Sequence, residues 1–317
     1  MTWSLRTGLL AAARAAYGTV GRTSLGRIPG VRWVSDLLFR LLWPRGTAVE
    51  IEGSRMHINP AHPNPTLRRT FMAYALRRTH EPATTQLFKE VVRPGDVVVD
   101  LGANMGYFTL LAARLVGSEG RVFAFEPEPT NFAHLTRNIE LNAYRQVTAY
   151  QKAVSDRYGS AKLFICTYDS GHHTINQFDG IAAYARGRPA TAEWVEIDTV
   201  PLDEFLGEAA ARVGVLKMDI EGAEALALDG MRRILTENRG LRVFTEFFPL
   251  LLTKMGSSPD AYARRLIHDF GFTVYAIGQD YSLARTGQGL IPIRSAGDLG
   301  VLVQAEDDHV NLFLVRE

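Results

Sequence analysis

The sequence predicts an α/β fold with a seven-stranded, mostly parallel sheet, an antiparallel last strand and a helical N-terminal extension. Two observations support this prediction. From Pro94 onward, short apolar runs alternate with helical patterns, which is typical of parallel strands joined by crossover helices. Residues 97–109 (VVVDLGANMGYFT) then indicate a buried strand, an acid at its end, a glycine turn and a helix start. That order places a nucleotide-type cofactor over the end of a strand.

The strands and helices follow one another along the chain. Core strands are expected at residues 97–101, 122–126, 147–154, 213–218, 241–245, 272–277 and 310–315, with helices at about 107–117, 129–142, 222–236 and 259–270. Two further strands, at 160–167 and 193–200, are expected to flank a polar loop at residues 168–192. A loop of that length within a compact domain is commonly functional or disordered.

The first part of the chain differs in composition from the rest. We predict an N-terminal extension at residues 1–65, helical and basic with a small hairpin near residues 49–58, followed by the main domain at residues 66–317. Seven arginines before residue 46 face a single acid, Asp36. Two interpretations fit residues 1–45: peripheral contact with a membrane surface, or a helical extension that packs on the core or on a second copy of the chain.

Composition narrows the function classes. The formal net charge of +1 gives no argument for a nucleic-acid partner. The single cysteine, Cys166, excludes an internal disulfide and a cysteine-based metal cluster, and it favours a reducing compartment. The apolar stretches near the N-terminus are too short and too charged for a secretory signal or a membrane span. We therefore predict a cytoplasmic protein, with peripheral membrane contact left open.

The glycine turn distinguishes between two cofactors. A dinucleotide site would place a glycine at the position of Asn104, and Asp100 would repel a pyrophosphate. The same acid suits a ligand with an ammonium and a sulfonium, and the helix N-terminus after Gly106 can bind the carboxylate of that ligand. Glu126, at the end of the next strand, is placed to accept ribose hydroxyls. The sequence therefore predicts S-adenosylmethionine as the cofactor.

A second group of acids follows the fourth core strand. Ligands of open α/β sheets bind outside the carboxyl ends of the strands, and this rule collects Asp100, Glu126, Ala153, Asp219 and Glu246 at one rim. An extended strand puts Lys217, Asp219 and Glu221 on one side, with Glu224 in the first turn of the following helix. If S-adenosylmethionine donates its methyl group to a hydroxyl oxygen, a base at this site must remove the proton of that hydroxyl. The candidates are Asp219, Glu246, His172 and His173. A metal is conceivable where acids and histidines converge, but no spacing matches a metal motif and none is predicted.

The chain resembles the FkbM-type S-adenosylmethionine-dependent methyltransferases over about residues 78–317. The matching segments are HEPATT at 80–85, PGD at 94–96, VDLGANMGYFT at 99–109, FEPEP at 125–129, residues 135–138 with 141–142, VPLD at 200–203 and LKMDIEGAE at 216–224. The resemblance implies a class I (Rossmann-like) methyltransferase fold and O-methylation of sugar, glycolipid or polyketide hydroxyls. It also implies that Asp100, Gly102, Asn104 and Glu126 hold the donor, with Asp219, Glu221 and Glu224 near the acceptor.

Together these arguments define a predicted site. The expected donor-binding residues are Glu81, Thr85, Asp100, Gly102, Ala103, Asn104, Gly106, Tyr107, Thr109, Glu126, Pro127 and Ala153. The expected acceptor-binding residues are Lys217, Glu221 and Glu224, and the expected catalytic residues are Asp219, His172, His173 and Glu246.

The predicted activity is methylation of a hydroxyl on a sugar, a glycan or glycolipid precursor, or a related natural product, with no nucleic-acid partner. Two alternatives remain: a nicotinamide-dependent oxidoreductase, which Asn104 disfavours, and a non-catalytic S-adenosylmethionine-binding scaffold that docks through its basic N-terminus.

Overall fold

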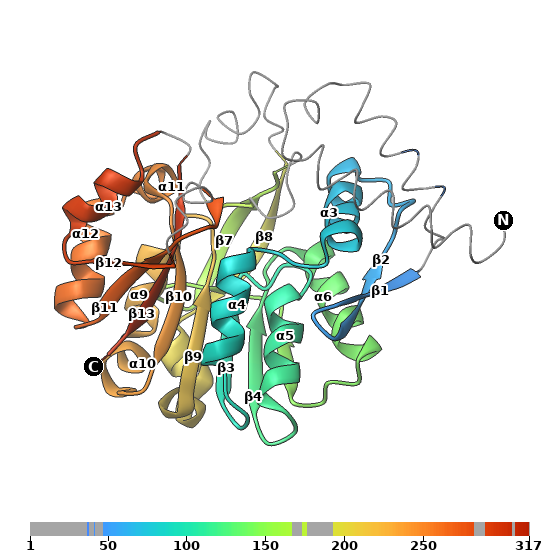
Figure 1. The fold of residues 1–317 in the computed structure, drawn as a ribbon, viewed down its shortest axis with the longest axis horizontal. Helices are drawn as coiled ribbons and strands as arrows, with labels where there is room; N and C mark the ends of the chain where they lie inside the picture. Colours follow the sequence, from blue (N-terminus) through green and yellow to red (C-terminus); the bar gives the residue numbers. More distant parts are fainter. Residues whose placement is uncertain are drawn as a thin grey trace. The chain divides into compact units, whose positions relative to one another are not determined.

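The computed structural model describes residues 37, 41, 47–166, 173–175, 193–281, 289–305 and 308–316 (Figure 1). The predictions for residues 1–45 therefore lie almost entirely outside the described residues. The chain divides into two compact units, residues 1–80 and 81–317. In the first unit, strands β1 (Thr47–Ile51) and β2 (Ser54–Ile58) form the predicted antiparallel hairpin, and helix α3 (Pro65–Arg77) follows.

The second unit is built on an eight-stranded sheet of order β12-β11-β13-β10-β9-β3-β4-β5. Its strands are β3 (Val97–Leu101), β4 (Arg121–Phe125), β5 (Val147–Tyr150), β9 (Val213–Met218), β10 (Arg242–Phe247), β11 (Thr273–Ile277), β12 (Leu290–Ile293) and β13 (Val310–Val315). The five strands from β10 to β5 are parallel, and β13 runs antiparallel to both β10 and β11. The α/β fold with an antiparallel last strand is confirmed. Strand β12, at the edge, adds an eighth strand to the seven predicted.

One predicted strand is divided in two. The run at residues 147–154 forms β5 in the main sheet and then β6 (Ala153–Val154), which pairs with β8 (Trp194–Val200). Strand β7 (Gly159–Phe164) completes a separate three-stranded sheet. The sequence pattern shows apolar residues along the whole run but does not show that its partner changes after Tyr150.

Helices cover both faces of the main sheet. They are α4 (Pro82–Val91), α5 (Tyr107–Val116), α6 (Pro129–Leu141), α8 (Leu202–Leu206), α9 (Glu224–Gly230), α10 (Arg232–Glu237), α11 (Pro249–Lys254), α12 (Pro259–Arg264) and α13 (Ala296–Leu302), with a 3₁₀ helix η2 (Gly207–Arg212) and a π-helical turn η3 (Arg265–Asp269). Helices α4 and α5 lie in front of β3 and β4 in Figure 1. The predicted helix at 222–236 is two helices that meet at Gly230, where a side chain would collide with the Ser155 carbonyl.

Strand alternation decides which side chains reach which face. Val97, Val99 and Leu101 of β3 belong to the apolar core that includes residues of α9, α10 and α12. Asp100 points to the opposite face, where Thr109 of α5 donates a hydrogen bond to it. None of the described helices is long and apolar enough to cross a membrane.

Candidate active site

A cavity lies at the carboxyl ends of β3, β4 and β9. It is lined by Leu101, Gly102, Asn104, Phe125, Glu126, Pro127, Asn131, Lys152, Ala153, Val154, Ser155, Leu163, His173, Ile175, Thr199, Asp219, Ile220, Glu221 and Ala223. Eight of these were predicted as site residues: Gly102, Asn104, Glu126, Pro127, Ala153, His173, Asp219 and Glu221. The structure therefore brings the predicted donor loop and part of the acidic segment after β9 to one space.

The glycine loop after β3 connects three strands. The amides of Gly102 and Ala103 both donate to the carbonyl of Phe125 at 2.9 Å, so the loop is tied to the end of β4. Gly102 has φ +78°, and a Cβ at this position would lie 1.9 Å from the Asp219 carbonyl oxygen. Only glycine allows this backbone conformation together with such close approach to the segment after β9.

Glu126 is the best-supported carboxylate in the cavity. The amide of Asn104 donates to its Oε2 at 2.7 Å, and the amide of Glu128 donates to its Oε1 at 2.9 Å. Burial raises the pKa of Glu126 to about 8, although these two hydrogen bonds oppose the shift. Each carboxylate oxygen can accept a further hydrogen bond. Glu126 can therefore still bind a pair of hydroxyls, the role predicted for it with the ribose.

Asp100 lies beneath the cavity and is not among the residues that line it. Its exposed fraction is 3%, and the Thr109 hydroxyl donates to its Oδ2 at 2.6 Å. Burial raises the pKa of Asp100, while Lys217 and Thr109 act in the opposite direction. Tyr107 and Thr85, also predicted as donor-binding, share a buried hydrogen bond of 3.1 Å in this layer. Asp100 precedes the glycine loop and Tyr107 and Thr109 follow it, so these hydrogen bonds fix both ends of the loop.

Glu81 belongs to a second buried network. Its carboxylate accepts hydrogen bonds from the Tyr281 hydroxyl and from the Asn311 side chain, the latter at 2.9 Å. Asn311 also donates to the Thr84 hydroxyl at 2.9 Å. Asp280 accepts from the backbone amide of Thr84 at 2.7 Å, at the start of α4. Glu81 thus ties the start of α4 to the last strand of the sheet.

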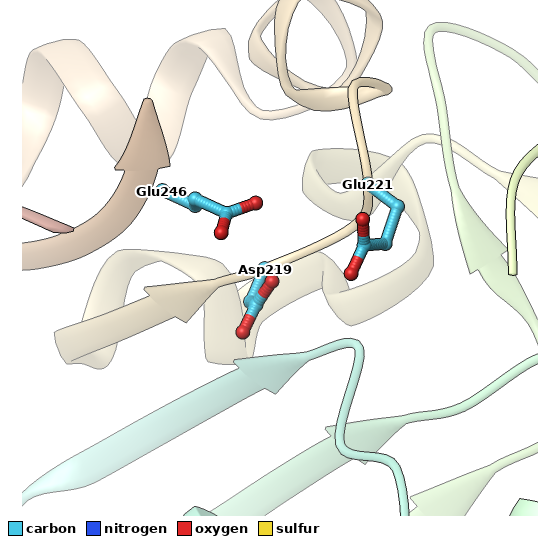
Figure 2. Close-up of side chains that lie close together, drawn as sticks. All are labelled: Asp219, Glu221 and Glu246. Atoms are coloured by element: carbon cyan, nitrogen blue, oxygen red, sulfur yellow. The ribbon is translucent and has the colours of Figure 1, made fainter. Parts of the chain in front are cut away.

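Three carboxylates converge at the ends of β9 and β10. Figure 2 shows Glu246 extending from β10 toward Asp219 and Glu221, which follow β9. One ligand atom from each lies within 4.8 Å of the others. Two like charges at that separation repel by roughly 3 kcal/mol at an effective dielectric constant of about 20. Holding three such charges together is unfavourable unless cations or protons compensate them.

The described cations compensate these charges only in part. Lys217 Nζ lies 3.0 Å from Asp219 Oδ2. Burial lowers the pKa of Lys217, but Asp219, Glu81 and Asp100 around it more than offset this, so the pKa is raised and the side chain stays charged. His309 Nε2 lies 3.8 Å from Glu246 Oε1, beyond hydrogen-bond distance.

Glu246 is the least satisfied of the three. Its exposed fraction is 8%, and its Oε2 has no hydrogen-bond partner among the described residues. Burial raises its pKa well above the usual value, and repulsion from Asp219 and Glu221 adds to the shift. A buried carboxylate oxygen without a donor is costly, which makes Glu246 the unusual acid of this site.

Glu224 has a different environment from the other acids of its segment. It is buried and accepts from the amide of Ile220 at 3.0 Å, so it closes the turn between β9 and α9. Burial raises its pKa to about 8. Glu224 does not line the cavity, and Lys217, Glu246 and Glu81 do not line it either.

Of the two histidines predicted as catalytic, the structure describes only His173. His172 lies outside the described residues. His173 lines the cavity, and the amide of Cys166 donates to its Nδ1 at 3.0 Å. In the neutral ring this arrangement leaves the proton on Nε2. Nε2 is then the ring nitrogen that can donate a hydrogen bond.

Several cavity residues were not predicted. Asn131 lies in the first turn of α6 and could have been found from its position shortly after Glu126. Lys152, Val154 and Ser155 surround the predicted Ala153, but their placement depends on the change of sheet after β5. Leu163, Ile175 and Thr199 come from or beside the three-stranded sheet, whose position over the cavity has no signal in a local pattern.

Comparison with known proteins identifies the family of this chain. The family model described as the methyltransferase FkbM domain matches residues 100–274. Methyltransferase 1 of Beauveria bassiana is 34% identical over 145 residues, which cover 42% of this chain and 57% of that protein. The 31-O-demethyl-FK506 methyltransferase FkbM of Streptomyces tacrolimicus is 35% identical over 163 residues, covering 44% and 61%. Hexuronic acid methyltransferase AglP of Haloferax volcanii is 29% identical over 157 residues, covering 49% and 58%.

Because the family model matches more than half of the chain, the protein belongs to the FkbM methyltransferase family. It carries an S-adenosylmethionine-dependent methyltransferase domain of the class I, Rossmann-like fold, as the sequence predicted. The aligned regions span 57–61% of the length of the relatives named above.

Proposed function

We propose that the protein transfers the methyl group of S-adenosylmethionine to a hydroxyl oxygen of a sugar, a glycan or glycolipid precursor, or a related natural product. Membership of the FkbM methyltransferase family supports methyl transfer. The names of two relatives, a 31-O-demethyl-FK506 methyltransferase and a hexuronic acid methyltransferase, support a hydroxylated small molecule or sugar as the acceptor.

The observation that carries this proposal is that Glu126, Asp219 and Glu221 all line a single cavity. The first carboxylate is held by two backbone amides, as a fixed hydrogen-bond acceptor requires. Asp219 and Glu221 follow the neighbouring strand β9. A methyltransferase needs one place that fixes the donor and, beside it, one place that fixes and deprotonates the acceptor.

The donor end fits S-adenosylmethionine. Glu126 can accept two ribose hydroxyls, and Gly102, Asn104 and Pro127 line the same space. When bound there, S-adenosylmethionine supplies a methyl group on a positively charged sulfur. The buried layer of Asp100 and Thr109 holds the loop in place beneath it.

At the acceptor end, we assign proton removal to Asp219. It lines the cavity, and Lys217 holds its Oδ2 at 3.0 Å, which fixes the orientation of the carboxylate. Asp219 can accept the proton of the attacking hydroxyl as that oxygen becomes the nucleophile. His173 would donate a hydrogen bond from Nε2 into the same space. The expected partner is a small molecule or a glycan, and the net charge of +1 gives no argument for a nucleic acid.

The test combines binding with turnover. Calorimetry with S-adenosylhomocysteine measures donor binding, and mass spectrometry measures methylation of a panel of uronic acids, glycosides and hydroxylated polyketides. We expect Asp219→Asn to bind S-adenosylhomocysteine as tightly as the wild type and to lose at least about a hundredfold in kcat. Normal turnover by Asp219→Asn would remove it as the base. Binding of NADH in place of S-adenosylhomocysteine would overturn the proposal as a whole.

A further inference from the structure

We propose that Asp219, Glu221 and Glu246 bind one divalent metal ion of the hard, oxygen-preferring class, such as Mg²⁺ or Mn²⁺. The site is formed by the segment after β9 and by the end of β10, two neighbouring parallel strands (Figure 2). The sequence showed no metal motif, because Glu246 lies on a different strand from the segment that holds Asp219 and Glu221, and the three follow no local spacing.

The spacing of the three carboxylates suits such an ion. One oxygen from each lies within 4.8 Å of the others. Two ligands on opposite sides of Mg²⁺ are about 4.2 Å apart, and neighbouring ligands about 3 Å apart, given metal–oxygen distances of about 2.1 Å. The carboxylates therefore need to move by no more than a side-chain adjustment to share one ion.

A second, independent observation points to a ligand. The Oε2 atom of Glu246 is buried and has no hydrogen-bond partner among the described residues. The side chain is only 9% exposed, and it extends toward the other two carboxylates. Buried oxygens of this kind are normally paired. A metal ion would supply the missing partner.

The charge balance favours the same conclusion. Three carboxylates meet at this point, whereas Lys217 is bound to Asp219 and His309 is 3.8 Å from Glu246. Lys217 also lies over the ring of Phe108, with its Nζ 4.7 Å from the ring centre, so it is held on the side of α5. A divalent ion would add positive charge on the side of the cluster where Glu246 lies.

The site is accessible and well placed for a role in catalysis. Asp219 and Glu221 line the cavity, so an ion held by them would face the proposed acceptor. There it would bind the hydroxyl oxygen of the acceptor and lower the pKa of that hydroxyl, and the proton would pass to Asp219. This catalytic role rests on the proposed function, whereas metal binding itself does not.

The experiment measures metal binding without any acceptor. The full chain, stripped with EDTA, is titrated with Mn²⁺, and free Mn²⁺ is followed by electron paramagnetic resonance. We expect one Mn²⁺ per chain with a dissociation constant on the order of 100 µM or less, displaced by Mg²⁺. Glu246→Gln should weaken binding at least about tenfold. Glu128→Gln is the matched control, because Glu128 is also buried but its carboxylate accepts from the amide of Asn131.

Thermal unfolding and S-adenosylhomocysteine binding show whether each variant is folded. If Glu246→Gln does not fold, Glu221→Gln provides a second test of metal binding. Absence of Mn²⁺ binding in the wild type, or equal binding in the wild type and both cluster variants, would overturn the proposed site. Methyl transfer that continues unchanged in EDTA would overturn the catalytic role of the ion. Failure of S-adenosylhomocysteine to bind would instead contradict the proposed function and leave the Mn²⁺ result to stand by itself.

Discussion

Glu126 and Glu246 occupy similar positions relative to their strands, but their hydrogen-bonding environments are opposite. Each lies at or just beyond the carboxyl end of a parallel strand, and each is more than nine-tenths buried. Both oxygens of Glu126 accept hydrogen bonds from backbone amides, whereas one oxygen of Glu246 has no donor among the described residues. The fold itself completes the first site. At the second region the fold brings three acids together, and the metal ion proposed above would be the partner of the Glu246 oxygen.

Gly102 connects the two regions, so its substitution should have the largest effect. In Gly102→Ala the new methyl group would collide with the backbone of Asp219, and the positive φ would add strain. We expect a loss of about 3 kcal/mol or more in the free energy of unfolding. Chemical denaturation measures it.

Gly95→Ala is the control for this substitution. Gly95 also has a positive φ, +84°, but a Cβ there would meet no atom within 4 Å. Gly95→Ala should lower the free energy of unfolding by about 1 kcal/mol, because only the strained backbone conformation contributes. Equal losses in the two variants would mean that close contact between the loop and Asp219 is not what requires glycine at position 102.

Exchanging the two glutamates for alanine compares the regions directly. Glu126→Ala removes the acceptor for ribose hydroxyls and leaves the amides of Asn104 and Glu128 without their partner. We expect its dissociation constant for S-adenosylhomocysteine, measured by calorimetry, to rise at least about a hundredfold. Glu246→Ala should change this constant by less than about threefold. If both variants weaken binding alike, the division into a donor end and an acceptor end is wrong.

The pH dependence of stability tests the buried acids near the second region. Because burial raises the pKa of Glu224 from 4.5 to about 8, the folded protein keeps a proton that the unfolded chain releases within this range. Stability that this group provides below pH 4.5 is therefore lost as the pH rises toward 8.

Glu224→Gln should remove this dependence, since the amide oxygen can still accept from Ile220. From pH 5 to pH 8, we expect the variant to gain roughly 3 kcal/mol relative to the wild type, measured by urea unfolding at each pH. Glu119→Gln, at an exposed position, should run parallel to the wild type. A parallel curve for Glu224→Gln as well would show that Glu224 is ionised in the folded protein.

The smallest effect is expected at His173. Its side chain accepts a hydrogen bond from the Cys166 amide and lines the cavity, so its loss should disturb the acceptor more than the donor. We expect His173→Ala to lower kcat about tenfold and to leave S-adenosylhomocysteine binding within threefold, with exposed His268→Ala as the control. A hundredfold loss would give His173 a role equal to that proposed for Asp219.

Local patterns were sufficient for much of this molecule. The strand before Gly102, the glycine turn and the acid at Glu126 follow one another within thirty residues, so the sequence predicts both the fold class and the donor end. The rule that ligands bind at the carboxyl ends of strands also placed Asp219 and Glu246 on one rim.

Other features depend on contacts that no local pattern contains. The side to which Asp100 points is set by the packing of α5 on β3, and the change of partner after β5 is set by β8. The proximity of Glu246 and Asp219 requires the register in which Thr245 pairs with Met218. Seven strands could be predicted from apolar runs, but β12 has Pro292 within it, which weakens its strand signal.

The network around Glu81 has a consequence for the order in which the domain is made. Residue 81 is hydrogen-bonded to Asn311, 230 positions later, and Asp280 holds the start of α4. During synthesis the first helix of this unit must wait for almost the entire remaining polypeptide before its buried carboxylate finds its partners. Such distant pairing slows folding. A ribosome-bound nascent chain lacking the final strand should therefore remain sensitive to proteases around α4.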